Sequence, residues 1–112
     1  RFIQKPIVLF RKSIRLSAEV RMKRSGIIWD LDLNEGIDFA IYMTGKFEPD
    51  TTEKLFSLLK PGNIALDIGA NIGLYTVYAS LKKKTKVVSF EPSVFNLELL
   101  ARNLYLNQMH MQ

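Results

Sequence analysis

Cysteine is absent from this 112-residue sequence, and histidine occurs once, as His110. The lack of cysteine excludes a disulfide scaffold, a cysteine-based zinc site and a cysteine nucleophile. A single histidine near the end also excludes a histidine-rich metal site, so we expect no bound metal. No apolar run approaches the ~18 residues that a membrane-spanning helix needs. The apolar stretch at residues 7–10 is too short for a secretory signal, and we expect a cytoplasmic protein.

What is present is typical of one small globular domain. Hydrophobic residues make up 47% of the chain and charged residues 24%, close to the average for folded proteins. A chain of this length can bury one small core. Because the sequence begins with Arg1 rather than Met, we expect the natural chain to start earlier.

Positive charge is concentrated at the N-terminus. Residues 1–24 hold eight Lys and Arg against one Glu, whereas residues 25–112 hold eight basic and ten acidic residues. A basic arm or helix over 1–24 can contact an anionic membrane surface, and the simpler interpretation is the solvated face of a peripheral helix. Only Phe2 and Phe10 are aromatic in this arm, so a stacking platform for nucleic acid is lacking and we do not expect a nucleic-acid partner.

Two hydrophobic periods follow one another in the first half. Apolar residues spaced by three or four predict an amphipathic helix over 7–20, just after Pro6. Residues 27–43 change to a period of two on both sides of a turn that ends at Gly36. This pattern predicts a β-hairpin in which Gly36 takes a positive φ.

The second half alternates between helices and short apolar strands. Asp50 and Glu53 form a capping-box pattern at the start of a helix predicted over 51–60, and Ser93 is placed to cap the last helix. The remaining elements are strands at 64–68 and 86–91 and helices at 74–83 and about 94–107. The sequence therefore predicts an α/β fold with a parallel βαβ unit, preceded by a β-hairpin and an N-terminal helix.

The residues best suited to bind a ligand lie in and around the turn at 69–73, between the first strand of the predicted βαβ unit and its helix. Ligands of open α/β sheets bind beyond the carboxyl ends of the strands. Gly69 permits a tight turn and a close approach of a ligand, and Gly73 permits close packing where the helix begins. Asp67 ends one strand and Glu91 ends the next, where a carboxylate can accept hydrogen bonds from both hydroxyls of a ribose. We expect both carboxylates to face one crevice.

Two phosphate-binding motifs fail at this turn. The dinucleotide fingerprint requires glycines where Asn71 and Leu74 stand, and the P-loop requires Ser or Thr where Phe47 follows Gly45-Lys46. The remaining pattern, D-x-G-x-N-x-G with a downstream acid, suits a nucleoside that carries no phosphates. S-adenosylmethionine fits it, with one acid for the ribose and one near the cationic methionine end.

These residues resemble the FkbM family of S-adenosylmethionine-dependent methyltransferases over about residues 29–107. The resemblance rests on Asp67-Ile68-Gly69-Ala70-Asn71-Ile72-Gly73, Phe90-Glu91-Pro92, Asn103-Leu104-Tyr105-Leu106-Asn107 and Gly45-Lys46-Phe47-Glu48-Pro49. It implies a class I, Rossmann-like methyltransferase fold with a seven-stranded, mostly parallel sheet. It also implies methyl transfer to oxygen, with a sugar or another small molecule as acceptor.

The resemblance also implies roles for individual residues. The first cofactor loop would comprise Asp67, Gly69, Ala70, Asn71 and Gly73. Glu91 would bind the ribose, Pro92 would shape the turn after it, and Glu48 would stand near the methionine end of the cofactor. The resemblance carries no catalytic base over to this segment.

A complete class I domain is roughly twice this length. Residues 25–112 therefore look like the N-terminal part of an incomplete methyltransferase domain, and we expect this chain alone to be inactive. Two other functions stay open. One is a non-catalytic remnant that binds a protein partner through its basic arm and unpaired sheet edge. The other is a fragment of an NAD-dependent oxidoreductase, which is disfavoured because Asn71 stands where the dinucleotide fingerprint requires its middle glycine.

Overall fold

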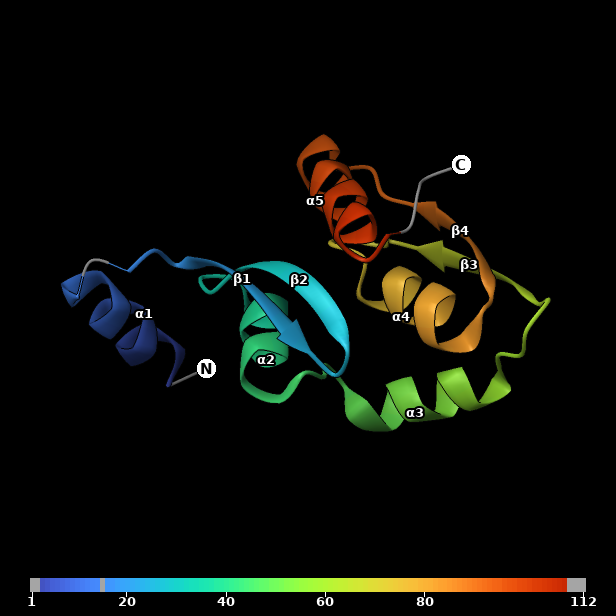
Figure 1. Ribbon diagram of the computed structural model, residues 1–112, viewed down its shortest axis with the longest axis horizontal. Coiled ribbons are helices and arrows are strands. Elements are labelled where there is room, and N and C mark those ends of the chain that lie inside the picture. Colours follow the sequence, from blue (N-terminus) through green and yellow to red (C-terminus); the bar gives the residue numbers. More distant parts are fainter. Residues whose placement is uncertain (1–2, 15, 109–112) are drawn as a thin grey trace. The chain divides into compact units, whose positions relative to one another are not determined.

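The computed structural model describes residues 3–14 and 16–108 and divides into two compact units, residues 1–47 and 48–112 (Figure 1). Phe2 and His110, which entered the sequence analysis, lie outside the described residues. Over the described residues, no helix is long and apolar enough to cross a membrane. The same residues contain no group of three His, Cys, Asp or Glu side chains that could hold a metal ion.

The first unit is a β-hairpin flanked by two helices. Its elements are α1 (Gln4–Ser13), β1 (Glu19–Arg24), β2 (Ile27–Asp32) and α2 (Gly36–Thr44). The two strands are antiparallel, with Glu19 opposite Asp32 and Arg24 opposite Ile27. Ser25 and Gly26 connect them with φ values of 51° and 77°, as a type I′ turn requires at both central residues.

The predicted hairpin over 27–43 is wrong in its second half. Residues 36–44 form α2 instead, and the turn glycine is Gly26 rather than Gly36. The run after Gly36 is almost continuously apolar, and such runs are not assigned to strand or helix by periodicity alone. Asp38, which follows Ile37 in this run, is buried in the first turn of α2 and accepts a hydrogen bond of 2.8 Å from the backbone N–H of Asp32.

The predicted helix over 7–20 is also too long. The helix ends at Ser13, and the chain from Glu19 onward pairs with β2. Strand pairing between distant residues overrides a local helical pattern here. The core of this unit includes a cluster of Val8, Leu33 and Phe39. Along β2, buried Ile27, Trp29 and Leu31 alternate with half-buried neighbours, which confirms the period of two before the turn.

The second unit contains the βαβ arrangement. Its elements are α3 (Pro49–Leu58), β3 (Ile64–Ile68), α4 (Leu74–Lys83), β4 (Lys86–Phe90) and α5 (Val94–Leu106). Strands β3 and β4 are parallel, with Ile64 opposite Lys86 and Ile68 opposite Phe90. The parallel unit predicted from the sequence is therefore confirmed, and the order of elements in this half is the predicted one.

The two predicted helix caps have different outcomes. Ser93 caps α5 as predicted, because its hydroxyl accepts a hydrogen bond from the backbone N–H of Asn96 at 3.3 Å. The Asp50 capping box is wrong, since α3 begins at Pro49, two residues before the predicted helix start at residue 51. Glu48, with a φ of 48°, is the N-cap, and Pro49 is the first helical residue. Proline is favoured there because its fixed φ suits a helix and no N–H is lost.

The two faces of the β3–β4 sheet differ. Four half-buried residues lie on one face: Ala65, Asp67, Val87 and Ser89. The other face carries large apolar side chains that are 40% to 79% exposed: Ile64, Leu66, Ile68, Val88 and Phe90. Strands of a parallel sheet are ordinarily covered on both faces. Among the described residues, each of these strands pairs only with the other.

Candidate functional site

The turn at residues 69–73 folds over the end of β4. The backbone N–H groups of Gly69 and Ala70 both donate to the carbonyl oxygen of Phe90, at 2.8 and 3.0 Å. The N–H of Gly73 donates to the carbonyl of Ala70 at 2.9 Å. Ala70 and Ile72 are buried. The turn is therefore held to the tip of the neighbouring strand by hydrogen bonds of its own backbone.

Glu91 joins this turn to the start of α5. One carboxylate oxygen accepts from the N–H of Asn71 at 2.9 Å, and the other accepts from the N–H of Ser93 at 2.8 Å. These hydrogen bonds, with that to Ser93 the larger effect, lower the pKa of Glu91 and so favour its ionised form. Because each carboxylate oxygen has two lone pairs, each can accept one further hydrogen bond. The neighbouring Pro92 is exposed.

Asp67 makes a different set of contacts. The hydroxyl of buried Thr76, on α4, donates to the Asp67 carboxylate at 2.6 Å. The Thr76 oxygen also lies 2.7 Å from the hydroxyl of Ser89. An ionised carboxylate only accepts, and each hydroxyl has one proton. The proton of Thr76 therefore points to Asp67, and Ser89 donates to Thr76.

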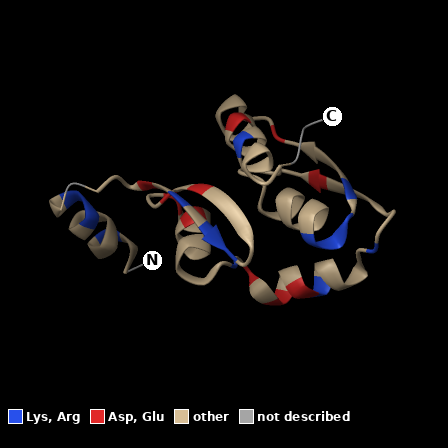
Figure 2. Cartoon of the chain, in the orientation of Figure 1, with Lys and Arg blue, Asp and Glu red and all other residues tan. Residues whose placement is uncertain are grey.

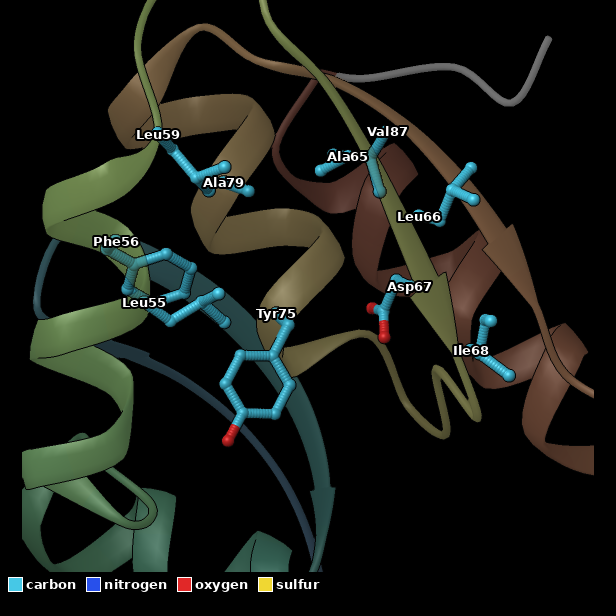
Figure 3. Close-up of a pocket in the computed structure, with 10 residues that line it drawn as sticks. All are labelled: Leu55, Phe56, Leu59, Ala65, Leu66, Asp67, Ile68, Tyr75, Ala79 and Val87. Carbon is cyan, nitrogen blue, oxygen red and sulfur yellow. The ribbon is translucent and has the colours of Figure 1, made fainter.

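A cleft of about 320 Å³ lies beside Asp67 (Figure 3). It is lined by residues of α3, β3, α4 and β4: Leu55, Phe56, Leu59, Ala65, Leu66, Asp67, Ile68, Tyr75, Ala79 and Val87. Figure 3 shows the Asp67 carboxylate projecting from β3 toward the side of α4 that carries Tyr75. Asp67 is the one charged residue among the described residues that line the cleft, and neither Glu48 nor Glu91 lines it.

The two glycines of the turn differ in their surroundings. Gly69 has a φ of +80°, and a Cβ atom there would meet nothing within 4 Å. Gly73 has a φ of +100°, and a Cβ atom there would collide with the side chain of Leu100 on α5. Gly69 thus leaves space for a ligand beside the backbone, whereas Gly73 leaves space for α5.

The expected site residues fall into two neighbourhoods of the second unit. Gly69, Ala70 and Asn71 belong to the turn that Glu91 holds, whereas Asp67 is tied to α4 by Thr76. Glu48 is exposed at the start of α3 and makes no side-chain capping hydrogen bond.

Sequence reasoning gave no role in the site to three residues that support it. Thr76 and Ser89 hold Asp67, and Asn103 of α5 donates from its side-chain amide to the carbonyl of Ile72 at 2.9 Å. Asn103 is fully buried, and a buried amide needs a partner. Its position between Leu100 and Leu104, on the buried side of a predicted helix, was the signal that could have identified it.

No known protein-family profile matches the sequence, and no curated protein matches it. Several solved structures are similar in fold. TYW2 from P. horikoshii in complex with MeSAdo has a TM-score of 0.65 at 17% identity, over 95% of this chain and 44% of that one. TYW2 from M. jannaschii in complex with AdoMet has a TM-score of 0.64 at 19% identity, over 83% of this chain and 40% of that one.

The tRNA (uracil-54, C5)-methyltransferase of Pyrococcus abyssi, in complex with S-adenosyl-L-homocysteine, is also similar. Its TM-score is 0.60 at 18% identity, over 84% of this chain and 22% of that one. The chain spans less than half the length of each of these three proteins. The α/β architecture predicted from the sequence is confirmed, and the chain has the fold of part of a class I, Rossmann-like methyltransferase domain.

Proposed function

We propose that this chain is the cofactor-binding part of a methyltransferase that uses S-adenosylmethionine. The observation that carries the proposal is the hydrogen bond of 2.9 Å between the N–H of Asn71 and the Glu91 carboxylate. It holds an ionised acid and the open turn at Gly69 side by side at the carboxyl ends of two parallel strands, where ligands of α/β sheets bind. Three proteins of similar fold are crystallised with AdoMet, MeSAdo or S-adenosyl-L-homocysteine.

Each expected site residue has a part in this proposal. Glu91 accepts hydrogen bonds from the ribose hydroxyls through its remaining lone pairs. The backbone at Gly69 lies against the nucleoside, and Asp67 attracts the cationic methionine end. Ala70, Asn71, Gly73 and Pro92 shape the turn and its approach to β4, and Glu48 is assigned to the methionine end on the resemblance alone.

The cofactor, when bound, supplies a methyl group on a sulfonium that an acceptor hydroxyl can attack. Glu91 would hold this cofactor by its ribose, the backbone at Gly69 by its nucleoside and Asp67 by its methionine end. The residues described above bind and orient one reactant, and orientation is a large part of such catalysis.

We assign a sugar or another small-molecule hydroxyl as acceptor, on the FkbM-like motifs. RNA is the competing acceptor class, because the Pyrococcus abyssi enzyme is a tRNA methyltransferase. Figure 2 shows basic residues on α1, on β1 and at the end of α4. Two of the described arginines of the first unit already have internal partners. Arg21 forms a 2.7 Å ion pair with Asp30, and Arg24 donates to the carbonyl of Tyr42 at 3.0 Å. Engaged guanidinium groups favour the small acceptor.

Residues 25–112 are, in this proposal, the first part of a larger methyltransferase domain. The exposed apolar face of the β3–β4 sheet supports it, since further helices would cover that face and further strands would pair with its edges. We expect the chain of residues 1–112 to lack transferase activity because, over the described residues, its sheet lacks the further strands and helices that would complete the domain.

The test is calorimetric titration of the natural full-length protein with S-adenosylmethionine. We expect Glu91→Ala to weaken binding at least tenfold, about 1.4 kcal/mol, because the ribose loses its acceptor. Glu98→Ala is the matched control, since Glu98 is exposed on α5. Wild-type affinity in Glu91→Ala would contradict the proposal.

Two alternative functions predict different results for the natural full-length protein. A non-catalytic remnant that binds a protein partner through its basic arm and unpaired sheet edge predicts no binding heat, and stable dimers of the same protein in analytical ultracentrifugation. An NAD-dependent enzyme predicts a response to NAD. The backbone N–H groups of Gly69, Ala70, Asn71 and Gly73 are already paired within the protein, so they cannot cradle a pyrophosphate.

A further inference from the structure

Helix α1 has one buried side and a broad exposed apolar side. Val8 is buried against Leu33 and Phe39 of the same unit, and half-buried Ile7 packs on this cluster. The amide of Gln4 donates to the carbonyl of Leu33 at 2.7 Å. These contacts fix which side of the helix faces its own unit.

Away from this docked side, four large apolar residues are exposed. Leu9 and Phe10 are each 64% exposed, and Ile3 and Ile14 at the two ends of the helix are 41% and 51% exposed. Ile3, Phe10 and Ile14 are seven and four residues apart, so they share one side of the helix. Apolar side chains gathered in this way mark a binding surface.

The cations beside this apolar surface indicate what covers it. Lys5 and Lys12 are exposed, and α1 contains no acidic residue. Both lysines lie on the Leu9 edge of this surface, since Lys5 comes four residues before Leu9 and Lys12 three residues after it. A helix with an apolar side, a basic edge and no acid is typical of segments that lie in the headgroup region of a membrane. The exposed face of the β3–β4 sheet differs, because its five large exposed side chains are all apolar and only Lys86 adds a charge at its margin.

We propose that the outer face of α1, defined as Ile3, Leu9, Phe10 and Ile14 with Lys5 and Lys12, binds an anionic lipid surface. The apolar side chains enter the headgroup boundary and the two ammonium groups lie at the level of the lipid phosphates. Val8 and Gln4 keep the helix attached to its own unit, so the rest of the first unit is held at the same surface.

This inference does not depend on the proposed cofactor chemistry, because no residue of α1 belongs to the candidate site. The experiment is co-sedimentation of the natural full-length protein with vesicles of phosphatidylcholine, with and without phosphatidylglycerol. We expect partition into the anionic vesicles that falls as salt is raised, since surface charges are screened.

Two variants separate the apolar and the charged contributions. Leu9→Ala/Phe10→Ala removes exposed apolar surface, and we expect it to lower the partition coefficient at least about tenfold. Lys5→Gln/Lys12→Gln removes two charges near the phosphates, and we expect about a tenfold loss on anionic vesicles only.

Matched controls use exposed residues elsewhere. Val94→Ala/Phe95→Ala on α5 and Lys82→Gln/Lys84→Gln at the end of α4 remove similar apolar area and the same charge, and both are expected to bind vesicles like the wild type. Circular dichroism checks that each variant is folded. The proposal would be overturned by equal binding to neutral and anionic vesicles, or by no binding to either. Dimers that Leu9→Ala/Phe10→Ala abolishes would also overturn it, in favour of a second copy of the chain as the occupant of this face.

Discussion

At the scale of single residues, three acidic side chains each accept hydrogen bonds from other parts of the chain. Asp67 accepts from Thr76, and Glu91 accepts from the backbone of Asn71 and Ser93. Asp38 accepts from the backbone of Asp32 while buried. Each of these carboxylates joins two elements, so each is also a point where a single substitution has a predictable cost.

Thr76 provides the first prediction. Thr76→Val keeps the shape of the side chain but leaves Asp67 and Ser89 without their shared partner. We expect the free energy of unfolding to fall by about 1–3 kcal/mol, measured by urea denaturation. Thr76→Ser retains the hydroxyl and is expected to lose clearly less. Equal losses in the two variants would show that the methyl group of Thr76, rather than its hydroxyl, provides the stability.

Asp38 provides a prediction about pH. Burial raises the pKa of Asp38 from its ordinary 3.8 to about 6. Between these values the folded protein binds more protons than the unfolded chain, so the free energy of unfolding falls as pH rises through this window. A shift of this size corresponds to at most about 3 kcal/mol.

Asp38→Asn should remove this pH dependence, because an amide oxygen can still accept the hydrogen bond from Asp32 and carries no charge. The measurement is urea unfolding at several pH values between 4 and 6. Asp50→Asn, at an exposed position of α3, is the control and should keep the wild-type slope. An unchanged slope in Asp38→Asn would assign the effect to another group.

At the scale of elements, the turn at 69–73 is fixed from three sides. Phe90 at the end of β4 accepts two of its N–H groups, Asn103 donates to it, and Leu100 fills the space beside Gly73. Two of these three residues lie on α5, which is about thirty residues further along the chain. The position of this helix therefore decides the conformation of the turn.

Gly73→Ala tests this arrangement. The new Cβ atom would collide with Leu100 and would also sit at a φ of +100°. We expect a loss of at least about 2 kcal/mol in the free energy of unfolding, from the collision and the backbone strain together. Gly62→Ala is the control, because Gly62 has a φ of +87° with nothing within 4 Å. A loss no larger than that of Gly62→Ala would mean that Leu100 moves aside freely.

Prediction of the elements succeeded where local signals agree with the fold. The strands and helix of the βαβ unit have short apolar runs, turn glycines and a capping serine that all favour the same structure. The segment at 36–44 is different, since its alternation of apolar residues is equally compatible with a buried helix. The burial of Asp38 beside Phe39, its hydrogen bond to the end of β2 and the exposure of Met43 break the period of two and distinguish the helix.

At the scale of the whole molecule, the dominant feature is the uncovered face of the β3–β4 sheet. Its apolar side chains are exposed in the chain of residues 1–112, and exposed apolar sheet faces and unpaired edges promote association. We therefore expect this chain to self-associate when expressed by itself.

Ile64→Lys/Val88→Lys tests the role of this face. In the chain of residues 1–112, we expect less self-association in analytical ultracentrifugation and no loss of folded structure, because both positions are already exposed. In the natural full-length protein, we expect the same substitutions to destabilise the fold, because further elements would bury the new charges. Equal stability of variant and wild type at full length would contradict the proposal that this face is covered. Leu58→Lys on α3 is the control in both proteins.

The sequence by itself determined the βαβ unit, the two glycines of the turn at 69–73 and the acid after the second strand. These depend on signals within a few residues, namely hydrophobic period, glycine and helix caps. The tertiary structure alone decided that residues 19–24 pair with 27–32, that 36–44 is a helix, and that Asp67 and Glu91 have separate partners. Each of these depends on contacts between residues distant in the chain, whose energies outweigh local preference.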